Sequence, residues 1–158
     1  MMSPAAQTWV LQDEAAQEAF GAQLAGACDG AVLIFLEGDL GAGKTTLTRG
    51  FVRGLGHRGA VKSPTYTLIE PYAVGGRRVY HLDLYRVADP GELEYLGLRE
   101  ILSEDAMVLI EWAGRGAGWL PPADLRVRIR HLTRGRQVEL EAGTARGEGI
   151  LGRMRPDL

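Results

Sequence analysis

The chain has 158 residues, of which 46% are hydrophobic and 24% charged, so a disordered or fibrous protein is excluded and one globular domain over residues 1–158 is expected. The formal net charge of −2 argues against a domain that binds DNA or RNA by itself, because such domains usually carry a basic excess. Cys28 is the only cysteine, which excludes an intrachain disulfide, and no signal peptide or membrane-length apolar run is present, so we expect a cytoplasmic protein with no membrane partner.

The first predicted elements are a helix, a strand and a second helix. Asp13 is a helix N-cap, and Glu14 follows in the first turn, where negative charge suits the helix dipole. Ala31–Leu36 is apolar without alternation, which predicts a strand that is buried on both faces in a parallel sheet. A glycine-rich loop then leads into a helix predicted over Lys44–Leu55.

The middle of the chain predicts a hairpin and a broken helix. Ser63–Tyr72 reads as a loop that runs into a strand, and a turn at Gly75-Gly76 joins it to a strand over Val79–Val87. Pro90–Leu102 follows with helix-start residues, and Gly97 is expected to interrupt this helix.

The last third of the chain predicts a second buried strand and a hairpin. Met107–Ile110 is apolar throughout, whereas Leu125–Leu132 and Gln137–Ala142 alternate cleanly and predict a C-terminal β-hairpin with one wet face. Residues 146–158 are polar and glycine-bearing, which predicts a loosely held tail.

Charged side chains share the wet face of this hairpin. Arg126, Arg128 and Arg130 lie on one side of the first strand, and Glu139 and Glu141 lie on one side of the second. Cross-strand charge pairing is the favoured interpretation, and an RNA-binding stripe is the alternative.

Gly38–Thr45 matches the phosphate-binding pattern G-x-x-x-x-G-K-[ST], known as Walker A, between a buried strand and a helix. The glycines let consecutive N–H groups surround a phosphate at the positive end of the helix dipole. Lys44 can reach the β- and γ-phosphates, the hydroxyl of Thr45 can bind Mg²⁺, and Thr46 can reach an inner phosphate. The predicted cofactor contacts of this segment are Asp39, Leu40, Gly41, Ala42, Gly43, Lys44, Thr45 and Thr46.

Hydrolysis also needs an acid beside the loop. Glu111 follows the apolar strand Met107–Ile110 and could bind Mg²⁺ or orient water, although a solvent-facing strand end is the alternative. Asp83 lies within an apolar and aromatic strand, so it is either functional or paired with a cation such as Arg86. His81 is interpreted as a core histidine, with a catalytic role as the alternative.

Three further features bear on the nucleotide. The chain contains no asparagine and therefore lacks the Asn-Lys-x-Asp element that reads guanine, which favours ATP. Leu11–Glu14 is a candidate to contact the base, with Glu14 in the predicted site. Thr65 lies where a nucleotide-sensing switch would fall, although the segment could be only a polar turn, and Trp112 either packs or stacks near the nucleotide.

Four motifs in this order resemble the bacterial tRNA threonylcarbamoyladenosine biosynthesis ATPases called TsaE (formerly YjeE). The resemblance runs from Asp13 to about Ala142, and the motifs are Gly38–Thr46, Ser63–Leu68, His81–Arg86 and Ile110–Trp112. It implies an α/β fold, namely a P-loop NTPase-like three-layer sandwich with a mostly parallel central sheet.

The resemblance also implies a slow ATPase that docks on two partners, TsaB and TsaD. TsaD transfers a threonylcarbamoyl group to an adenosine next to the anticodon of tRNAs that read codons starting with A, so tRNA is reached indirectly. The ATPase is thought to reset the complex. The carried-over roles are Mg²⁺ ligands for Thr45 and Glu111, phosphate binding for Asp39–Thr45, a switch for Thr65, support of the metal site for Asp83, and proximity to the nucleotide for Trp112.

Two other functions remain open from the residues. A small-molecule P-loop kinase would need a cationic lid, for which Arg77-Arg78 or Arg115 are available, but no paired acid and arginine pocket follows the second strand. A nucleotide-dependent binding module would use Glu111 only to complete the metal site.

Overall fold

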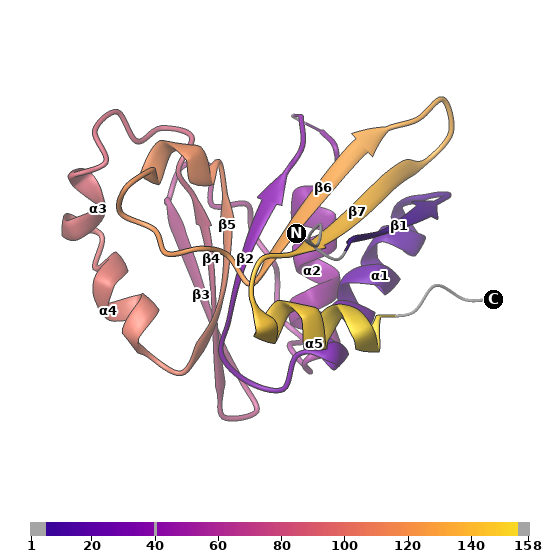
Figure 1. Cartoon of the computed structure of the whole chain (residues 1–158), viewed down its shortest axis with the longest axis horizontal. Helices are drawn as coiled ribbons and strands as arrows, with labels where there is room; N and C mark the ends of the chain where they lie inside the picture. The colour runs from indigo at the N-terminus through magenta and orange to yellow at the C-terminus, as the bar shows by residue number, and fades with distance from the viewer. Residues whose placement is uncertain (1–5, 40, 155–158) are drawn as a thin grey trace.

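The computed structural model describes residues 6–39 and 41–154, and the predicted cofactor contact Leu40 and residues 155–158 lie outside this part of the chain. One sheet of seven strands runs in the order β1-β7-β6-β2-β5-β4-β3 (Figure 1). The elements are β1 (Ala6–Leu11), α1 (Glu14–Ala27), β2 (Val32–Glu37), α2 (Lys44–Gly54), β3 (Ile69–Val74), β4 (Arg77–Asp83), α3 (Glu92–Tyr95), α4 (Leu98–Ser103), β5 (Ala106–Glu111), the 3-10 helix η1 (Ala113–Gly116), β6 (Leu125–His131), β7 (Arg136–Ala142) and α5 (Ala145–Arg153).

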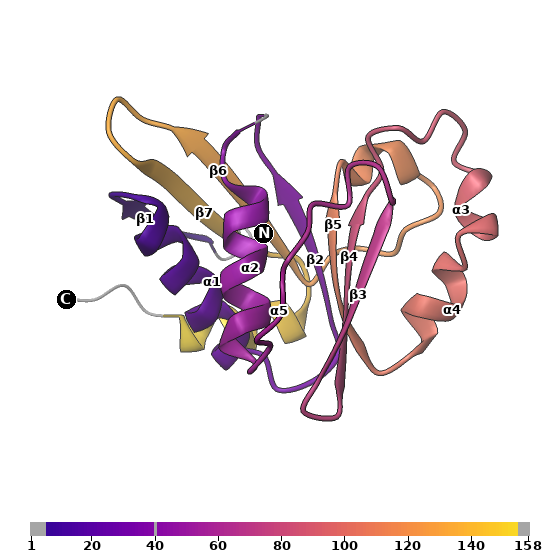
Figure 2. The same ribbon diagram turned by 180° about the vertical axis from the view of Figure 1, so that it is seen from behind.

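Strands β6, β2, β5 and β4 form a parallel centre, and β1, β7 and β3 join it by antiparallel pairing. The sheet is therefore mixed, with the predicted parallel arrangement in its middle. Alternate residues of β2 point to opposite faces: Ile34 packs into a core with α1, α2 and α5, whereas Phe35 packs into a second core with α3 and α4. Figure 2 shows α1 and α2 against the face of the sheet that carries the first core. With α3 and α4 on the second core, the structure has the predicted three layers.

Cys28 belongs to the first core, as predicted. Its side chain is buried beside the end of α1, and this burial raises the pKa of the thiol to about 12. No helix of residues 6–39 and 41–154 has the combination of length and apolar content needed to cross a bilayer.

Most predicted elements are confirmed within a residue or two. The side chain of Asp13 caps α1 by accepting from Ala16 N at 2.8 Å. Gly97, with φ 75°, separates α3 from α4 as expected of the broken helix. The strand predicted to reach Val87 ends earlier, at Asp83, because Tyr85 N turns back to donate to the Asp83 carboxylate.

Two parts of the chain differ from the prediction. β1 pairs with β7 at the edge of the sheet and was not predicted, since its alternation is short. The prediction of a loose tail from residue 146 is wrong as far as Arg153, because α5 is capped by Thr144 and buries Ile150 and Leu151 against the first core.

The predicted charge pairing across the hairpin is confirmed for Arg128, whereas Arg126 pairs with a glutamate of β2 instead. Arg128 forms ion pairs with Glu37, Glu139 and Glu141 at 3.0, 2.9 and 3.4 Å. Arg126 pairs with Glu37 at 3.3 Å, so these guanidinium groups are engaged by carboxylates of neighbouring strands.

Candidate functional site

The glycine-rich loop and both predicted acids lie at one edge of the sheet. The loop follows β2, and the residue-by-residue pairing places Leu36 opposite Glu111 and Glu111 opposite Asp83. Because β2, β5 and β4 are parallel, their carboxyl ends meet where the loop begins. This is the edge at which ligands of open α/β sheets bind.

The loop needs glycine at the position before α2. Gly43 has φ 109°, and a Cβ there would lie 2.5 Å from Oε1 of Gln17 on α1. Thr45 and Thr46 lie half-buried in the first turn of α2, where the helix dipole presents its positive end. Asp39 is exposed and its carbonyl accepts from Ala42 N at 3.0 Å.

Two side chains outside the motif hold the loop carbonyls. Gln17 donates through Nε2 to Ala42 O at 3.1 Å, and Arg136 at the start of β7 donates through Nε to the same oxygen at 3.2 Å. Arg136 also reaches Gly41 O at 3.5 Å. Sequence reasoning missed both residues, although Gln17 is a polar residue on the face of α1 that carries Phe20, and it is buried there.

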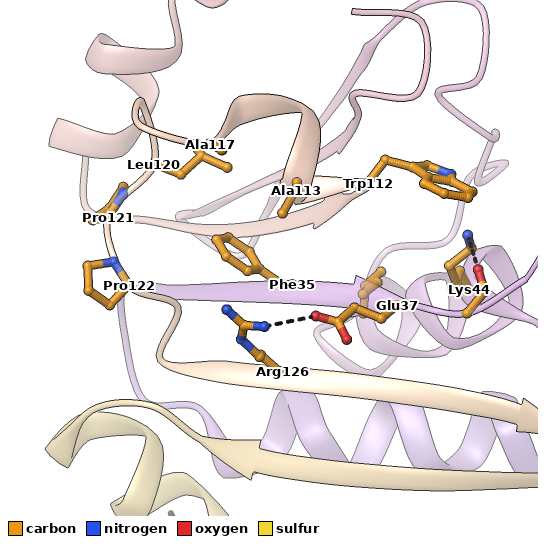
Figure 3. Close-up of a pocket in the computed structure, with 13 residues that line it drawn as sticks. Phe35, Glu37, Lys44, Trp112, Ala113, Ala117, Leu120, Pro121, Pro122 and Arg126 are labelled. Atoms are coloured by element: carbon orange, nitrogen blue, oxygen red, sulfur yellow. Dashed lines mark hydrogen bonds and ion pairs between the residues drawn. The ribbon is translucent and has the colours of Figure 1, made fainter. Parts of the chain in front are cut away.

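Lys44 points toward the acids rather than into solvent. Its Nζ donates to Gly38 O at 2.7 Å and lies 3.5 Å from Oε1 of Glu111. Figure 3 shows the ammonium group beside Trp112, 4.7 Å from the centre of its ring. The side chain is only 6% exposed. The ammonium group is therefore held at the glycine-rich loop by Gly38 O and Glu111.

Glu111 is buried, so the solvent-facing alternative is wrong. It is 5% exposed, and while Oε1 faces Lys44, its Oε2 lies 2.7 Å from Nε2 of His81. His81 is fully buried as expected of a core histidine, but it contacts the candidate acid.

Asp83 is the second buried acid. Burial raises the pKa of its carboxyl group, the negative charge of Glu111 adds to this rise, and the Tyr85 N–H that donates to Oδ1 at 3.0 Å opposes it, as do Lys44 and His81. The predicted alternative of pairing with Arg86 is wrong. In the described residues, Arg86 forms no ion pair with Asp83.

We expect Asp83→Asn to stabilise the ligand-free protein at neutral pH. The raised pKa means that ionised Asp83 opposes folding above its folded-state pKa, and this cost disappears as pH falls and the group is protonated. Thermal unfolding at pH 7 should show a higher Tm for Asp83→Asn than for the unsubstituted chain, and this difference should shrink at acid pH, where Asp83 is protonated. A lower Tm at pH 7 would contradict this assignment.

The predicted switch segment touches the strand that carries Asp83. Thr65 Oγ1 lies 2.7 Å from Ser63 Oγ, and no hydrogen bond joins Thr65 to Lys44 or to the acids within the described residues. The turn closes where Leu68 N donates to Pro64 O at 2.8 Å, and Leu68 O then accepts from Asp83 N at 3.0 Å. The turn is therefore hydrogen-bonded directly to the end of β4.

Trp112 packs beside the site in a strained conformation. Its ring lies 5.0 Å from that of Tyr85, and its own φ is 58°. In the described residues, the only other non-glycine residue with positive φ is Leu68 (φ 69°). Each of the two is next to one acid: Trp112 follows Glu111 in the chain, and Leu68 O accepts from Asp83 N. Backbone strain of this kind is typical of functional sites.

Two cavities lie on either side of the loop. One, of about 300 Å³, is lined by polar residues that include Glu14, Gln17, Thr46 and Arg136. Glu14 therefore lies beside the glycine-rich loop, and its carboxylate also forms an ion pair with Arg49 at 2.6 Å. The other, of about 650 Å³, is mainly apolar, runs from Lys44 and Trp112 past Phe35 to the prolines, and is shown in Figure 3. The residues that line its far end are Leu120, Pro121, Pro122 and Arg126.

The donor set fits a nucleotide with Mg²⁺. No group of three or more His, Cys, Asp or Glu side chains in residues 6–39 and 41–154 could hold a metal by itself. Mg²⁺ fits such a site because it takes one or two protein ligands and completes its shell with waters and phosphate oxygens. The buried carboxylate of Glu111 and the hydroxyl of Thr45, at the start of α2, are suitable ligands of this kind.

The chain is similar to proteins of one family. The family described as threonylcarbamoyl adenosine biosynthesis protein TsaE matches residues 11–138. The tRNA threonylcarbamoyladenosine biosynthesis protein TsaE of Haemophilus influenzae is 53% identical over 121 residues, covering 77% of each chain, and that of Bacillus subtilis is 46% identical over 98 residues, covering 62% of this chain and 61% of the relative. The crystal structure of B. subtilis YdiB superimposes with a TM-score of 0.83 at 30% identity, over 96% of this chain and 95% of the other, and shows the same P-loop NTPase-like fold.

Proposed function

The chain belongs to the TsaE family of tRNA threonylcarbamoyladenosine biosynthesis proteins, and we propose that within this process it is a Mg²⁺-dependent ATPase that assists a TsaB–TsaD complex. One observation carries the proposal: the loop lysine Lys44 lies 3.5 Å from the buried carboxylate of Glu111. This contact supports the proposal because a cation that binds phosphate and an acid that binds the metal must lie together beside the phosphates.

The nucleotide occupies both the loop and the polar cavity beside it. Asp39–Thr45 bind the β- and γ-phosphates through backbone N–H groups, and Thr46 binds an inner phosphate. The ribose and base then lie in the 300 Å³ cavity, between Glu14 and Arg136. This path leaves the γ-phosphate at the Lys44 end of the loop, next to Glu111.

Thr45 and Glu111 would hold Mg²⁺, and Asp83, opposite Glu111 in register, would support the site from the neighbouring strand. When bound, the metal neutralises charge that develops on the transferred phosphoryl group. Lys44 exchanges its contact with Gly38 O for phosphate oxygens, and Glu111 or Asp83 orients the attacking water. Thr65, in the turn attached to β4, reads whether the γ-phosphate is present.

Partner docking is supported by the side chains at the rim of the site. Tyr66 is 79% exposed and Tyr85 45% exposed, and the guanidinium groups of Arg86 and Arg115 lie over these rings at 4.3 and 5.7 Å. Exposed Tyr and Arg side chains are the types most often found at the centre of protein interfaces. TsaB and TsaD are the proposed partners, tRNA is reached through them, and the cytoplasm is the proposed compartment.

The experiment is ATP hydrolysis by the pure chain, then with TsaB and TsaD added, alongside threonylcarbamoyl transfer to tRNA. We expect slow hydrolysis alone and partner-dependent turnover. Tyr66→Ala should weaken partner binding by about 10–30-fold, as a contact worth ~2 kcal/mol would, and leave ATP affinity unchanged. Tyr95→Ala, a 94% exposed tyrosine on α3, is the matched control. Phosphoryl transfer to a metabolite without partners would instead identify a small-molecule kinase.

A further inference from the structure

His81 lies directly behind the candidate metal ligand. It shares a face of β4 with Asp83, because side chains two residues apart on a strand point the same way. Asp83 pairs in register with Glu111, so His81 lies two residues before this pair along β4, farther from the edge of the sheet where the loop lies. Its side chain is 0% exposed.

The imidazole has one partner, and that partner is Glu111. Nε2 lies 2.7 Å from Oε2, whereas Nδ1 is buried with no hydrogen-bond partner among the described residues. A carboxylate oxygen accepts, so Nε2 carries the proton that is donated.

The two oxygens of Glu111 therefore have different surroundings. Oε2 is held from the core by His81, and Oε1 faces Lys44 at 3.5 Å. A glutamate side chain has three rotatable bonds and a broad terminal torsion, so one oxygen must be fixed for the other to keep its direction. Histidines and carboxylates behind metal ligands serve this purpose in other sites.

Packing alone does not account for this residue. The neighbours of His81 on β4 include the fully buried apolar residues Val79 and Leu82, and an apolar side chain would fill the same space without burying an unpartnered nitrogen. The contact with Glu111 is what a histidine adds at this position.

The geometry points to His81 as a positioning residue, which holds Oε2 of Glu111 so that Oε1 alone is presented to Mg²⁺ and the phosphate loop. This inference rests on the proposed function, since it concerns how Glu111 performs it. His81 itself touches neither nucleotide nor metal and acts through the carboxylate.

The test compares His81→Met, which has similar length and no donor, with His81→Gln, whose amide nitrogen can take the place of Nε2. Metal binding is measured by electron paramagnetic resonance of Mn²⁺ with a non-hydrolysable ATP analogue, and nucleotide affinity is measured separately in EDTA. We expect His81→Met to weaken Mn²⁺ binding and hydrolysis by about 10–100-fold, and His81→Gln to restore most of the loss. Affinity in EDTA should not change.

Leu82→Met is the matched control, because Leu82 is equally buried on the opposite face of the same strand. If His81→Met does not fold, His81→Asn replaces it, since the shorter amide cannot reach Oε2 and should behave like the methionine variant. Adding His81→Met or His81→Asn to Glu111→Ala should produce no further loss of metal binding.

Equal losses in the methionine (or asparagine) and glutamine variants would overturn the inference, as would a loss that persists in the Glu111→Ala background or unchanged Mn²⁺ binding in all His81 variants. These outcomes leave the proposed function intact. A wild-type chain that shows no metal-dependent ATP binding would refute the proposed function itself.

Discussion

Lys44→Ala is expected to remove most of the affinity of the chain for ATP. Lys44 is the cation that the glycine-rich motif itself contributes, and two charge-assisted hydrogen bonds to phosphate oxygens would be lost with its ammonium group. At about 1.5–3 kcal/mol for each such bond, ATP affinity should fall by about 100-fold or more. Isothermal titration calorimetry with ATP and Mg²⁺ measures this directly.

The substitution also removes a partner of Glu111, so folding must be measured beside binding. In Lys44→Ala the buried carboxylate of Glu111 keeps His81 as a partner but loses the ammonium group. Thermal unfolding of this variant shows whether that loss lowers the stability of the fold. Arg53→Ala removes a half-exposed cation from the last turn of the same helix and should bind ATP normally. Normal ATP affinity in a folded Lys44→Ala protein would show that phosphates do not bind at this loop.

Local patterns predicted the elements that build the site. The buried strand before the loop, the helix after it and the strand that ends at Glu111 are all confirmed, because each depends on residues close together in the chain. Parallel pairing then follows from the continuous apolar runs of β2 and β5, which need cover on both faces.

Contacts between distant segments could not be predicted from the sequence. Gln17 and Arg136 reach the loop from 25 and 94 residues away along the chain, and no local pattern indicates such a contact. His81 could be placed on a strand, but its bond to Glu111 depends on the register between β4 and β5. The edge strand β1 and the helix α5 were missed because their short or polar sequences gain stability from packing against the sheet.

Glu111→Gln is expected to separate binding from hydrolysis. The amide keeps the shape of the side chain and a bond to His81 through its oxygen, but it loses the charge that would bind Mg²⁺ or orient water. ATP affinity should stay within a few-fold, and hydrolysis with partners present should fall by about 10²–10⁴-fold, the range given by loss of a catalytic acid or base.

The pattern of losses also identifies what Glu111 does. If it only completes the metal site, as in a binding module, then high Mg²⁺ should restore the activity of Glu111→Gln, whereas loss of a water-orienting group is not recovered by more metal. Glu139→Gln is the control, because it removes a carboxylate of the same kind from the ion-paired hairpin, away from the loop. Equal loss of ATP binding and hydrolysis in Glu111→Gln would mean that the catalytic acid is another residue, and Asp83, opposite it in register, is then the one to test next.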